Sequence, residues 1–337
     1  MFDILNTTLF ATGSAVLFDC DGAELAVAAV KGTFEFPENG HAAVPAQEQM
    51  AVLDRDAYEG DPEMSGIRYP ADLIPGKRGT DIGLAGTVYN PTAEPVKKLK
   101  ASVRVGECSK EILALGDRFW IKNLMRPGYT ITDPLPFDRM PISTNRTFGG
   151  TSRNRQGDEV RFAENPVGTG FVLPGNPLGG LKLPNFEDPK IRIKTYRKSY
   201  PPASFGFSLP CAAHRLPFAG TYDEAWMNYR RPLYPEDLDV RFFNCAQPEL
   251  IADGFLQGGE SLALTHLTPD GFRAFQLPRY DIRMTFIIKG QRIQKKARLH
   301  TVMIEPDLNR FYMTWWASER TGKTPRHLDW IEVDSMH

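Results

Sequence analysis

The sequence predicts a mainly β protein of antiparallel, sandwich-like sheets, with a long, irregular, turn-rich central segment and few short helices. Stretches near both ends alternate apolar and polar residues with period two. This period is typical of strands that bury one face. Long amphipathic helices and strand–helix–strand alternation are absent from the sequence. Sheets without crossover helices bury their apolar faces against each other, which favours a sandwich.

Residues 1–125 form the first predicted β-rich region. Alternation in residues 25–29, which leads to Phe34 and Phe36, predicts a first half-buried strand. Residues 82–88 and 99–105 repeat the pattern and predict two further strands.

The last predicted β-rich region spans residues 246–337. Residues 282–288 and 299–304 alternate, and Glu305–Asn309 reads as a five-residue turn. The following strand, Phe311–Trp316, has aromatic residues on both faces, which predicts that it is covered on both sides. Whether the two β-rich regions and the segment between them form one composite domain stays open.

The central segment, residues 126–245, is crowded with Pro, Gly, Asn and Arg, whose dipeptides mark turns. So long an irregular stretch in a compact protein is usually functional or disordered. Interleaved phenylalanines argue for order, because aromatic rings bury large areas. One short helix is predicted: Thr221 and Glu224 have the spacing of a capping box, and Pro232 and Pro235 would end the helix soon after Arg230.

Composition and charge exclude several classes of protein. The formal net charge of -1 argues against a general binder of nucleic acid or of membrane surfaces, since both need a basic field. The amino terminus lacks a basic start, and no apolar run is long enough to cross a bilayer, so we expect a soluble, cytoplasmic protein. The four cysteines are far apart, which predicts free thiols and neither a disulfide framework nor a zinc site. We expect no cofactor.

Sequence motifs for catalysis fail at named positions. Lys77 follows a glycine but lacks the rest of a phosphate loop, Gly168–Gly170 lacks the third glycine of a dinucleotide loop, and Ser208 is followed by Pro210 where a nucleophile elbow needs glycine. The six histidines are not paired at metal-ligand spacing. His300 lies in an alternating strand and is expected to be structural, whereas His214 is the best candidate base.

Carboxylates of the central segment allow two interpretations. Glu187 with Asp188, or Asp237 with Asp239, could form an acid–base pair of the kind that glycosidases use. Neighbours on a strand point to opposite faces, however, so Glu187 and Asp188 would not converge. We favour a scaffold role, in which Asp and Asn cap turns and the arginines at 146, 215, 230 and 231 pair with the carboxylates.

Four motifs of the central segment occur together in a fixed order: Arg146–Gly150, Asn165–Gly170, Leu183–Pro189 and Ala219–Trp226. With flanking residues such as Lys31–Phe34, Thr80–Asp81, Gly116–Trp120 and Thr301–Pro306, this set resembles the bacterial family called "domain of unknown function 2169". The resemblance covers nearly the whole chain and leaves residues 317–337 outside.

This resemblance implies a non-enzymatic adaptor, or chaperone, that helps load a toxic type VI secretion effector onto the spike protein and its PAAR-type tip. It transfers no catalytic residue. The candidate interaction or scaffold residues are Arg146, Phe148, Asn165, Asn185, Glu187, Asp188, Arg215, Tyr222, Asp223, Trp226 and Arg230. Two alternatives stay open: a hydrolase or carbohydrate-active enzyme using Glu187, Asp188, Asp223, Asp237 or His214, and a structural component of the secreted tip.

Overall fold

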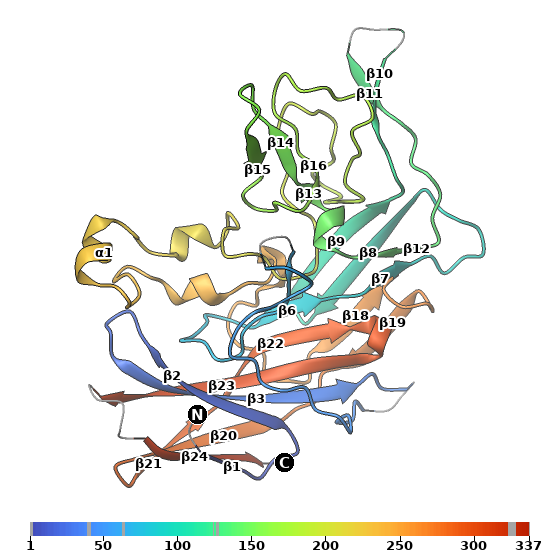
Figure 1. Cartoon of the computed structure of the whole chain (residues 1–337). Coiled ribbons are helices and arrows are strands. Elements are labelled where there is room, and N and C mark those ends of the chain that lie inside the picture. Colours follow the sequence, from blue (N-terminus) through green and yellow to red (C-terminus); the bar gives the residue numbers. More distant parts are fainter. Residues whose placement is uncertain are drawn as a thin grey trace.

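The computed structural model describes residues 3–38, 42–62, 65–123, 125, 128–322 and 328–336. With 42% strand and 7% helix, it confirms the predicted mainly β fold with antiparallel sheets and few helices. Figure 1 shows the long strands gathered at one end of the molecule and the irregular central segment extending away from them.

The largest sheet has five strands in the order β2-β3-β23-β22-β6. All neighbours are antiparallel except β6, which runs parallel to β22. The sheet draws strands from both β-rich regions of the sequence: β2 (Ala11–Phe18), β3 (Glu24–Glu35), β6 (Asp81–Leu84), β22 (Arg298–Glu305) and β23 (Arg310–Gly322).

Two further sheets also combine distant parts of the chain. The order β17-β9-β8-β18-β19 joins β8 (Lys98–Val105), β9 (Cys108–Leu115), β17 (Phe186–Glu187), β18 (Ser261–Thr265) and β19 (Phe272–Gln276). The order β1-β24-β20-β21 joins β1 (Ile4–Asn6), β20 (Asp281–Ile288), β21 (Gln291–Lys296) and β24 (Leu328–Met336). The carboxyl-terminal residues therefore extend β23 and supply β24.

The remaining elements are short. Five two-stranded sheets pair β4 (Ala57–Tyr58) with β5 (Ile67–Tyr69), β7 (Thr87–Tyr89) with β12 (Arg139–Pro141), β10 (Trp120–Lys122) with β11 (Tyr129–Ile131), β13 (Phe148–Gly149) with β16 (Thr169–Gly170), and β14 (Thr151–Arg153) with β15 (Glu159–Arg161). The helices of the described residues are α1 (Glu224–Tyr229) and the 3₁₀ turns η1 (Thr144–Arg146), η2 (Leu216–Phe218), η3 (Val240–Phe243), η4 (Pro248–Leu250) and η5 (Pro306–Leu308).

Burial along the predicted strands agrees with the sequence pattern for β8 and departs from it for β3. In β8, Ala101, Val103 and Val105 are buried while the intervening residues are partly or fully exposed, as period two predicts. Strand β3 was expected to be half-buried, but it is buried on both faces. One face packs in the main core and the other packs against Trp316 and its neighbours, so the alternation does not mark a solvent-facing side.

The aromatic strand β23 is covered on both sides, as predicted. Phe311 and Trp315 belong to the main core, and Trp316 belongs to the smaller cluster on the opposite face. The predicted turn before this strand contains η5 and ends at Asn309, which adopts the left-handed conformation with φ 51°. Asparagine tolerates that conformation better than most residues.

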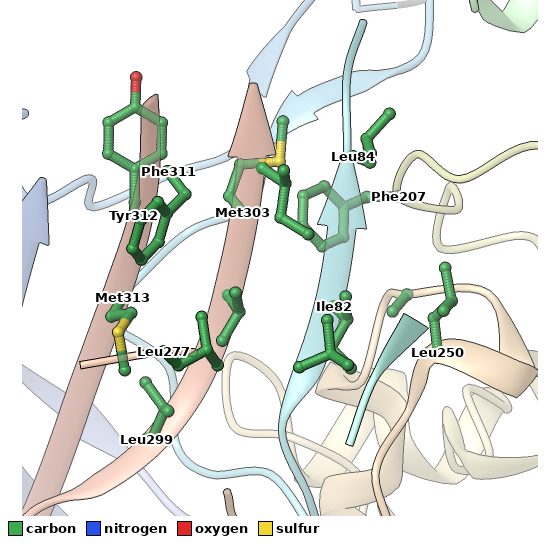
Figure 2. Packing of buried hydrophobic residues seen from close by; sticks show 14 of the residues in the cluster. Ile82, Leu84, Phe207, Leu250, Leu277, Leu299, Met303, Phe311, Tyr312 and Met313 are labelled. Carbon is green, nitrogen blue, oxygen red and sulfur yellow. The ribbon is translucent and has the colours of Figure 1, made fainter. Parts of the chain in front are cut away.

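The central segment is anchored on the largest sheet by Phe207. Figure 2 shows its ring lying against the strand that carries Ile82 and Leu84, close to Met303 of β22. A Cβ atom at Gly83 would lie 2.2 Å from Cζ of Phe207, so glycine is what lets the ring approach the strand. The segment also forms a second, small core together with Trp120 of β10; its buried residues are Trp120, Phe148, Leu178, Leu183, Ile193 and Tyr200.

Helices that could cross a membrane are not found: none in the part of the chain that the structure describes is both long and apolar enough.

Candidate functional site

Glu187 is an internal ion-pairing residue. Its side chain is buried, and its two carboxylate oxygens accept hydrogen bonds from Arg118 at 2.6 Å and from Arg192 at 2.5 Å. Arg118 also donates to the backbone carbonyl of Pro184 at 2.9 Å. The prediction that arginines 146, 215, 230 and 231 serve such carboxylates was therefore wrong for Glu187. Its partners come from outside that set because pairing follows distance in space.

Asp188 does not share a site with Glu187, as the alternation of strand neighbours predicts. Its carboxylate accepts the backbone N–H of Lys190 at 2.7 Å, and the residue lines a surface cavity. The two adjacent carboxylates therefore have different surroundings. Glu187 forms buried ion pairs, and Asp188 lines a surface cavity.

Asn165 holds the loop that contains the first family-like motif. Its side-chain amide donates to the carbonyls of Thr144 and Phe148, at 3.0 and 3.1 Å, and to the hydroxyl of Thr147 at 2.8 Å. Gly149 passes so close that a Cβ there would lie 2.2 Å from the carbonyl oxygen of Asn165, and its φ of 150° also favours glycine. The loop is thus built around a buried amide.

Asn185, in the Leu183–Pro189 motif, has the same kind of role. Its amide nitrogen donates to the carbonyl of Leu115 at 3.0 Å and to the carboxylate of Asp117 at 2.9 Å. Its amide oxygen accepts a long hydrogen bond, 3.4 Å, from Arg146. Arg146 therefore contacts an amide where we predicted a carboxylate. The buried polar groups of an irregular backbone must find partners, and these side chains supply them.

Arg215 is also a scaffold residue. It is buried, and its guanidinium donates to the carbonyls of Ser208 at 2.6 Å and Phe242 at 3.1 Å. The same group lies 5.0 Å from the centre of the Phe242 ring, within cation–π distance. Backbone carbonyls and an aromatic face take the place of the predicted carboxylate.

The helix α1 begins two residues later than the predicted capping box implies. Asp223 is the N-cap, and its carboxylate accepts the backbone N–H of Trp226 at 2.8 Å. Thr221 instead bonds Asp237 through its hydroxyl at 2.7 Å and its N–H at 2.9 Å, and these bonds hold the pKa of Asp237 below its ordinary value. The prediction of Thr221 as the cap was wrong because the carboxylate of Asp223 lies closer to the free helical amides.

Arg230 fastens the end of α1 to the rest of the protein. Its guanidinium donates to the carbonyl of Tyr234 at 2.8 Å, to Glu236 at 2.9 Å and to the carbonyl of Cys20 in the turn between β2 and β3. We predicted that Arg230 pairs with a carboxylate of the central segment, and it does so with Glu236. Arg231 is exposed.

An exposed apolar patch lies on α1 and just before it. Tyr229 is 90% exposed, Met227 59% and Tyr222 52%; we call these three residues the α1 patch. Trp226 lies beside them: its ring is 4.7 Å from that of Tyr222, and its indole N–H donates to the carbonyl of Leu233 at 2.9 Å. Figure 1 shows α1 at the outer end of the central segment, beyond the turn between β2 and β3. The patch is therefore presented on a braced projection.

A cavity of about 300 Å³ lies where the central segment covers β5, β6 and β9. Its wall is largely apolar and includes Ile67, Leu84, Ile142, Phe207 and Met303. Its polar residues include Glu59, Glu164, Asp188 and His214. Apolar cavities with a few polar groups are the usual form of binding sites in proteins. We call this feature the acidic cavity, because carboxylates outnumber cations in its wall.

His214 lines the acidic cavity but has a backbone partner. Its Nε2 atom lies 3.2 Å from the carbonyl oxygen of Ala246, so this nitrogen carries the hydrogen. Burial lowers the pKa of His214, which keeps the ring neutral near pH 7. The carbonyl of Ala246 therefore fixes the orientation of the ring.

The flanking motifs also lie in the interior. Lys31 and Asp72 form a buried ion pair at 2.5 Å, and Lys77 and Asp81 form another at 2.7 Å. His300 is buried between these pairs and contacts the hydroxyl of Thr301 at 2.7 Å and the carbonyl of Asp72 at 3.1 Å, as expected for a structural histidine. These motif residues hold the sheets and loops together.

Metal and disulfide chemistry find no support in the described residues. The four cysteines are free thiols; Cys245 is buried, and Cys20, Cys108 and Cys211 are partly exposed. No group of three or more His, Cys, Asp or Glu side chains in the described part of the chain could hold a metal ion. His41, His327 and His337 lie outside the described residues.

Several surface residues of interest were not identified from the sequence. Met227 and Tyr229 are missed, although Tyr222, Trp226 and Tyr229 have the spacing of one helical face. Glu59 and Glu164 of the acidic cavity belong to no motif, and their convergence depends on residues far apart in the chain.

Comparison with known proteins gives a family. No curated protein and no solved structure matches the chain. One family model, described as "Uncharacterized protein conserved in bacteria (DUF2169)", matches residues 21–316. The match ends where the resemblance in the sequence ends, before the last part of β23 and β24. Since it covers most of the chain, including every motif of the central segment, the protein belongs to the DUF2169 family.

Proposed function

We propose that this protein is a non-enzymatic adaptor that binds a type VI secretion effector in the cytoplasm and helps load it onto the spike protein and its PAAR-type tip. Membership of the DUF2169 family is the basis for naming these partners, through the role that the resemblance implies. The observation that carries a binding function is the α1 patch, because Tyr and Met are residue types that anchor protein interfaces.

The bracing of α1 supports this proposal. Asp223 caps the helix and Arg230 ties its end to the β2–β3 turn, so the exposed side chains are held in place before a partner arrives. A pre-ordered surface loses less conformational entropy on binding than a flexible one. The patch is therefore suited to recognition.

The internal contacts of the candidate carboxylates favour an adaptor over a hydrolase. Glu187 is held by two arginines, Asp223 caps α1, and Asp237 is bonded to Thr221. Glu187 and Asp237 use both carboxylate oxygens on neighbours within the chain. Of the candidates for catalysis, Asp188 and His214 line the acidic cavity.

Affinity purification from the source bacterium tests the proposal. The tagged protein should capture an effector together with spike or tip proteins, identified by mass spectrometry, and co-expression should raise the soluble yield of that effector. The double variant M227A/Y229A should lose at least about tenfold of the captured effector, because interface anchors of this type contribute more than 1.4 kcal/mol. The control L308A removes an apolar side chain on η5 that is 53% exposed, close to Met227, and should leave capture unchanged.

A secretion assay separates the adaptor from its alternatives. Deletion of the gene should abolish delivery of the effector, and the protein itself should stay out of the culture supernatant once lysis is controlled for. Unchanged delivery in the deletion strain would refute the adaptor. Appearance of the protein in the supernatant at the level of the spike would favour a structural tip component.

A further inference from the structure

The acidic cavity carries an excess of negative charge. Its wall contains five carboxylates and two permanent cations, a formal excess of three negative charges. Both cations are already paired: Arg68 with Glu305 at 2.7 Å and Lys110 with Glu249 at 2.7 Å. His214 adds no positive charge because burial keeps it neutral. The wall therefore keeps a formal negative excess, although Lys110 pairs with Glu249 and the charge of Arg68 acts on Glu59.

Three of the carboxylates form no ion pair among the described residues: Glu59, Glu164 and Asp188. Burial raises the pKa of Glu59, and the charge of Arg68 partly offsets that rise. Asp188 accepts the backbone N–H of Lys190 at 2.7 Å. The backbone at Thr144 lowers the pKa of Glu59 and the backbone at Ala213 lowers that of Glu164, each against the larger rise that burial causes. A carboxylate accepts several hydrogen bonds, so each retains free capacity for a ligand.

Glu164 is the most informative of the three. It is half-buried, and its burial raises the pKa of the carboxyl above its ordinary value. The nearby Cys211 thiol is neutral near pH 7, since its own pKa is also raised, mainly by burial. A carboxylate in a partly dry site without a cation is destabilised relative to water, and an incoming cation would relieve that cost.

The apolar part of the wall sets the shape of the ligand. Its apolar residues include Ile67 of β5 and Ile142, Pro201, Pro202 and Phe207 of the central segment. A volume of about 300 Å³ is at the small end for ligand sites, so it suits one or two side chains and excludes a folded element. Lys and Arg combine an aliphatic stem with a charged end, which matches an apolar wall that carries carboxylates.

We propose that the acidic cavity receives a lysine or arginine side chain from an extended segment of the partner protein, with its charged end at Glu164, Glu59 and Asp188. The inference rests on the proposed function, since it names the chemistry by which the adaptor would recognise its partner. Charge complementarity selects this occupant. The α1 patch would supply apolar anchoring and the cavity would add specificity for a basic residue.

Binding of small probes tests the cavity separately from any effector. The probes are the Nα-acetyl amides of arginine and lysine, with that of citrulline as the uncharged isostere, titrated into the full-length protein by calorimetry or NMR. The two cationic probes should bind, and citrulline should bind about tenfold more weakly because it lacks the charge. Raising the salt concentration should weaken the cationic probes alone. Equal binding of citrulline, or no binding of any probe, overturns the inference.

Matched variants locate the binding. Glu164→Gln keeps the size and shape of the side chain and removes its charge, so the affinity of the arginine probe should fall about tenfold. Glu59 is exposed, and Glu59→Gln should also lower the affinity of the arginine probe. This second variant tests the inference if Glu164→Gln folds poorly. Glu94→Gln removes an exposed carboxylate outside the cavity wall and should change nothing. Unchanged affinity in both cavity variants overturns the inference.

Two further comparisons complete the test. One asks whether the bound cation is a peptide side chain or a free amine, and the other distinguishes failure of the cavity inference from failure of the proposed function. Putrescine, a free diamine, should bind more weakly than the peptide-like probes; tighter binding would assign the cavity to a small amine and overturn the inference. If the wild type captures an effector and the variants E59Q and E164Q capture it equally, the cavity inference fails while the adaptor stands. If the probes bind as expected but no effector is captured, the adaptor fails.

Discussion

The phenolic hydroxyl of Tyr312 donates a 2.5 Å hydrogen bond to the carboxylate of Glu305, which is fully buried at the end of β22. Three other donors converge on the same group: Arg68 at 2.7 Å, Tyr69 at 2.6 Å and Arg310 at 3.0 Å. Burial by itself would raise the pKa of Glu305, but these four donors outweigh it and hold the pKa below the ordinary 4.5. A single buried carboxylate thus joins β5, β22 and β23.

Replacement of Glu305 should make stability less dependent on pH. Because the folded pKa is depressed, the charged Glu305 stabilises the fold above about pH 4.5, and this contribution is lost as the pH falls through the lower folded pKa. Glu305→Gln should cost about 3 kcal/mol at pH 7, because it leaves the arginines without their buried anion. Urea denaturation at pH 7 and pH 3.5 should show the difference between wild type and variant shrinking in acid. A difference that grew in acid would contradict the depressed pKa.

The buried pair of Lys77 and Asp81 predicts an asymmetry between single and double variants. Asp81 also accepts hydrogen bonds from the Asn244 amide and the Cys245 N–H, both at 2.9 Å. Asp81→Ala should destabilise the protein by about 4 kcal/mol, because it leaves a buried ammonium unpaired. The double variant K77M/D81L should be distinctly more stable than Asp81→Ala in thermal and urea denaturation. A double variant as unstable as the single one would show that the cation is not the cause.

Contact between Gly83 and Phe207 predicts a steric effect. Gly83→Ala places a methyl group 2.2 Å from the ring, so it should destabilise the protein by about 2 kcal/mol through overpacking. Gly179→Ala is the control, since no atom lies within 4 Å of the added Cβ, and it should change stability by less than about 0.5 kcal/mol. Combining Gly83→Ala with Phe207→Leu should give a double variant less unstable than the two single effects add up to. Strict additivity would remove Phe207 as the cause.

Capping by Asp223 predicts a local effect on the proposed docking surface. Asp223→Ala should cost about 1 kcal/mol of helix stability, and Asp223→Asn, which keeps a capping oxygen, should cost much less. Hydrogen exchange of the α1 amides should accelerate in the Ala variant, while the sheets keep their protection. Effector capture should fall in proportion to the loosening of α1. Unchanged exchange in α1 would contradict the assignment of Asp223 as the cap.

Much of the β framework was predictable because it depends on local pattern. Period-two alternation identified β8, β20 and β22, and the aromatic run identified β23. The same pattern could not show that β3 is buried on both faces, because a polar or small residue in a strand does not say what covers it. The pattern also could not show which strands pair with each other in a sheet. Strand β3, for example, pairs with β23, which lies far along the chain.

For the candidate residues, the sequence predicted their general role but not their individual partners. Composition indicated that the Asn and Arg side chains of the central segment support an irregular backbone, and Asn165, Asn185 and Arg215 do so. The pairing of Glu187 with Arg118 and Arg192 was not predictable, because several arginines were available in the sequence and the choice among them depends on distance.

The sequence by itself determined the mainly β class, the turn-rich central segment and the motifs that place the chain in its family, since each follows from residue type and spacing along the chain. The tertiary structure alone decided that Asn165, Asn185, Glu187 and Arg215 are turned inward, that α1 presents exposed Tyr and Met side chains, and that Glu59, Glu164 and Asp188 line one cavity. The physical reason is that burial, ion pairing and charge balance depend on which residues meet in space, and local pattern carries no information about that.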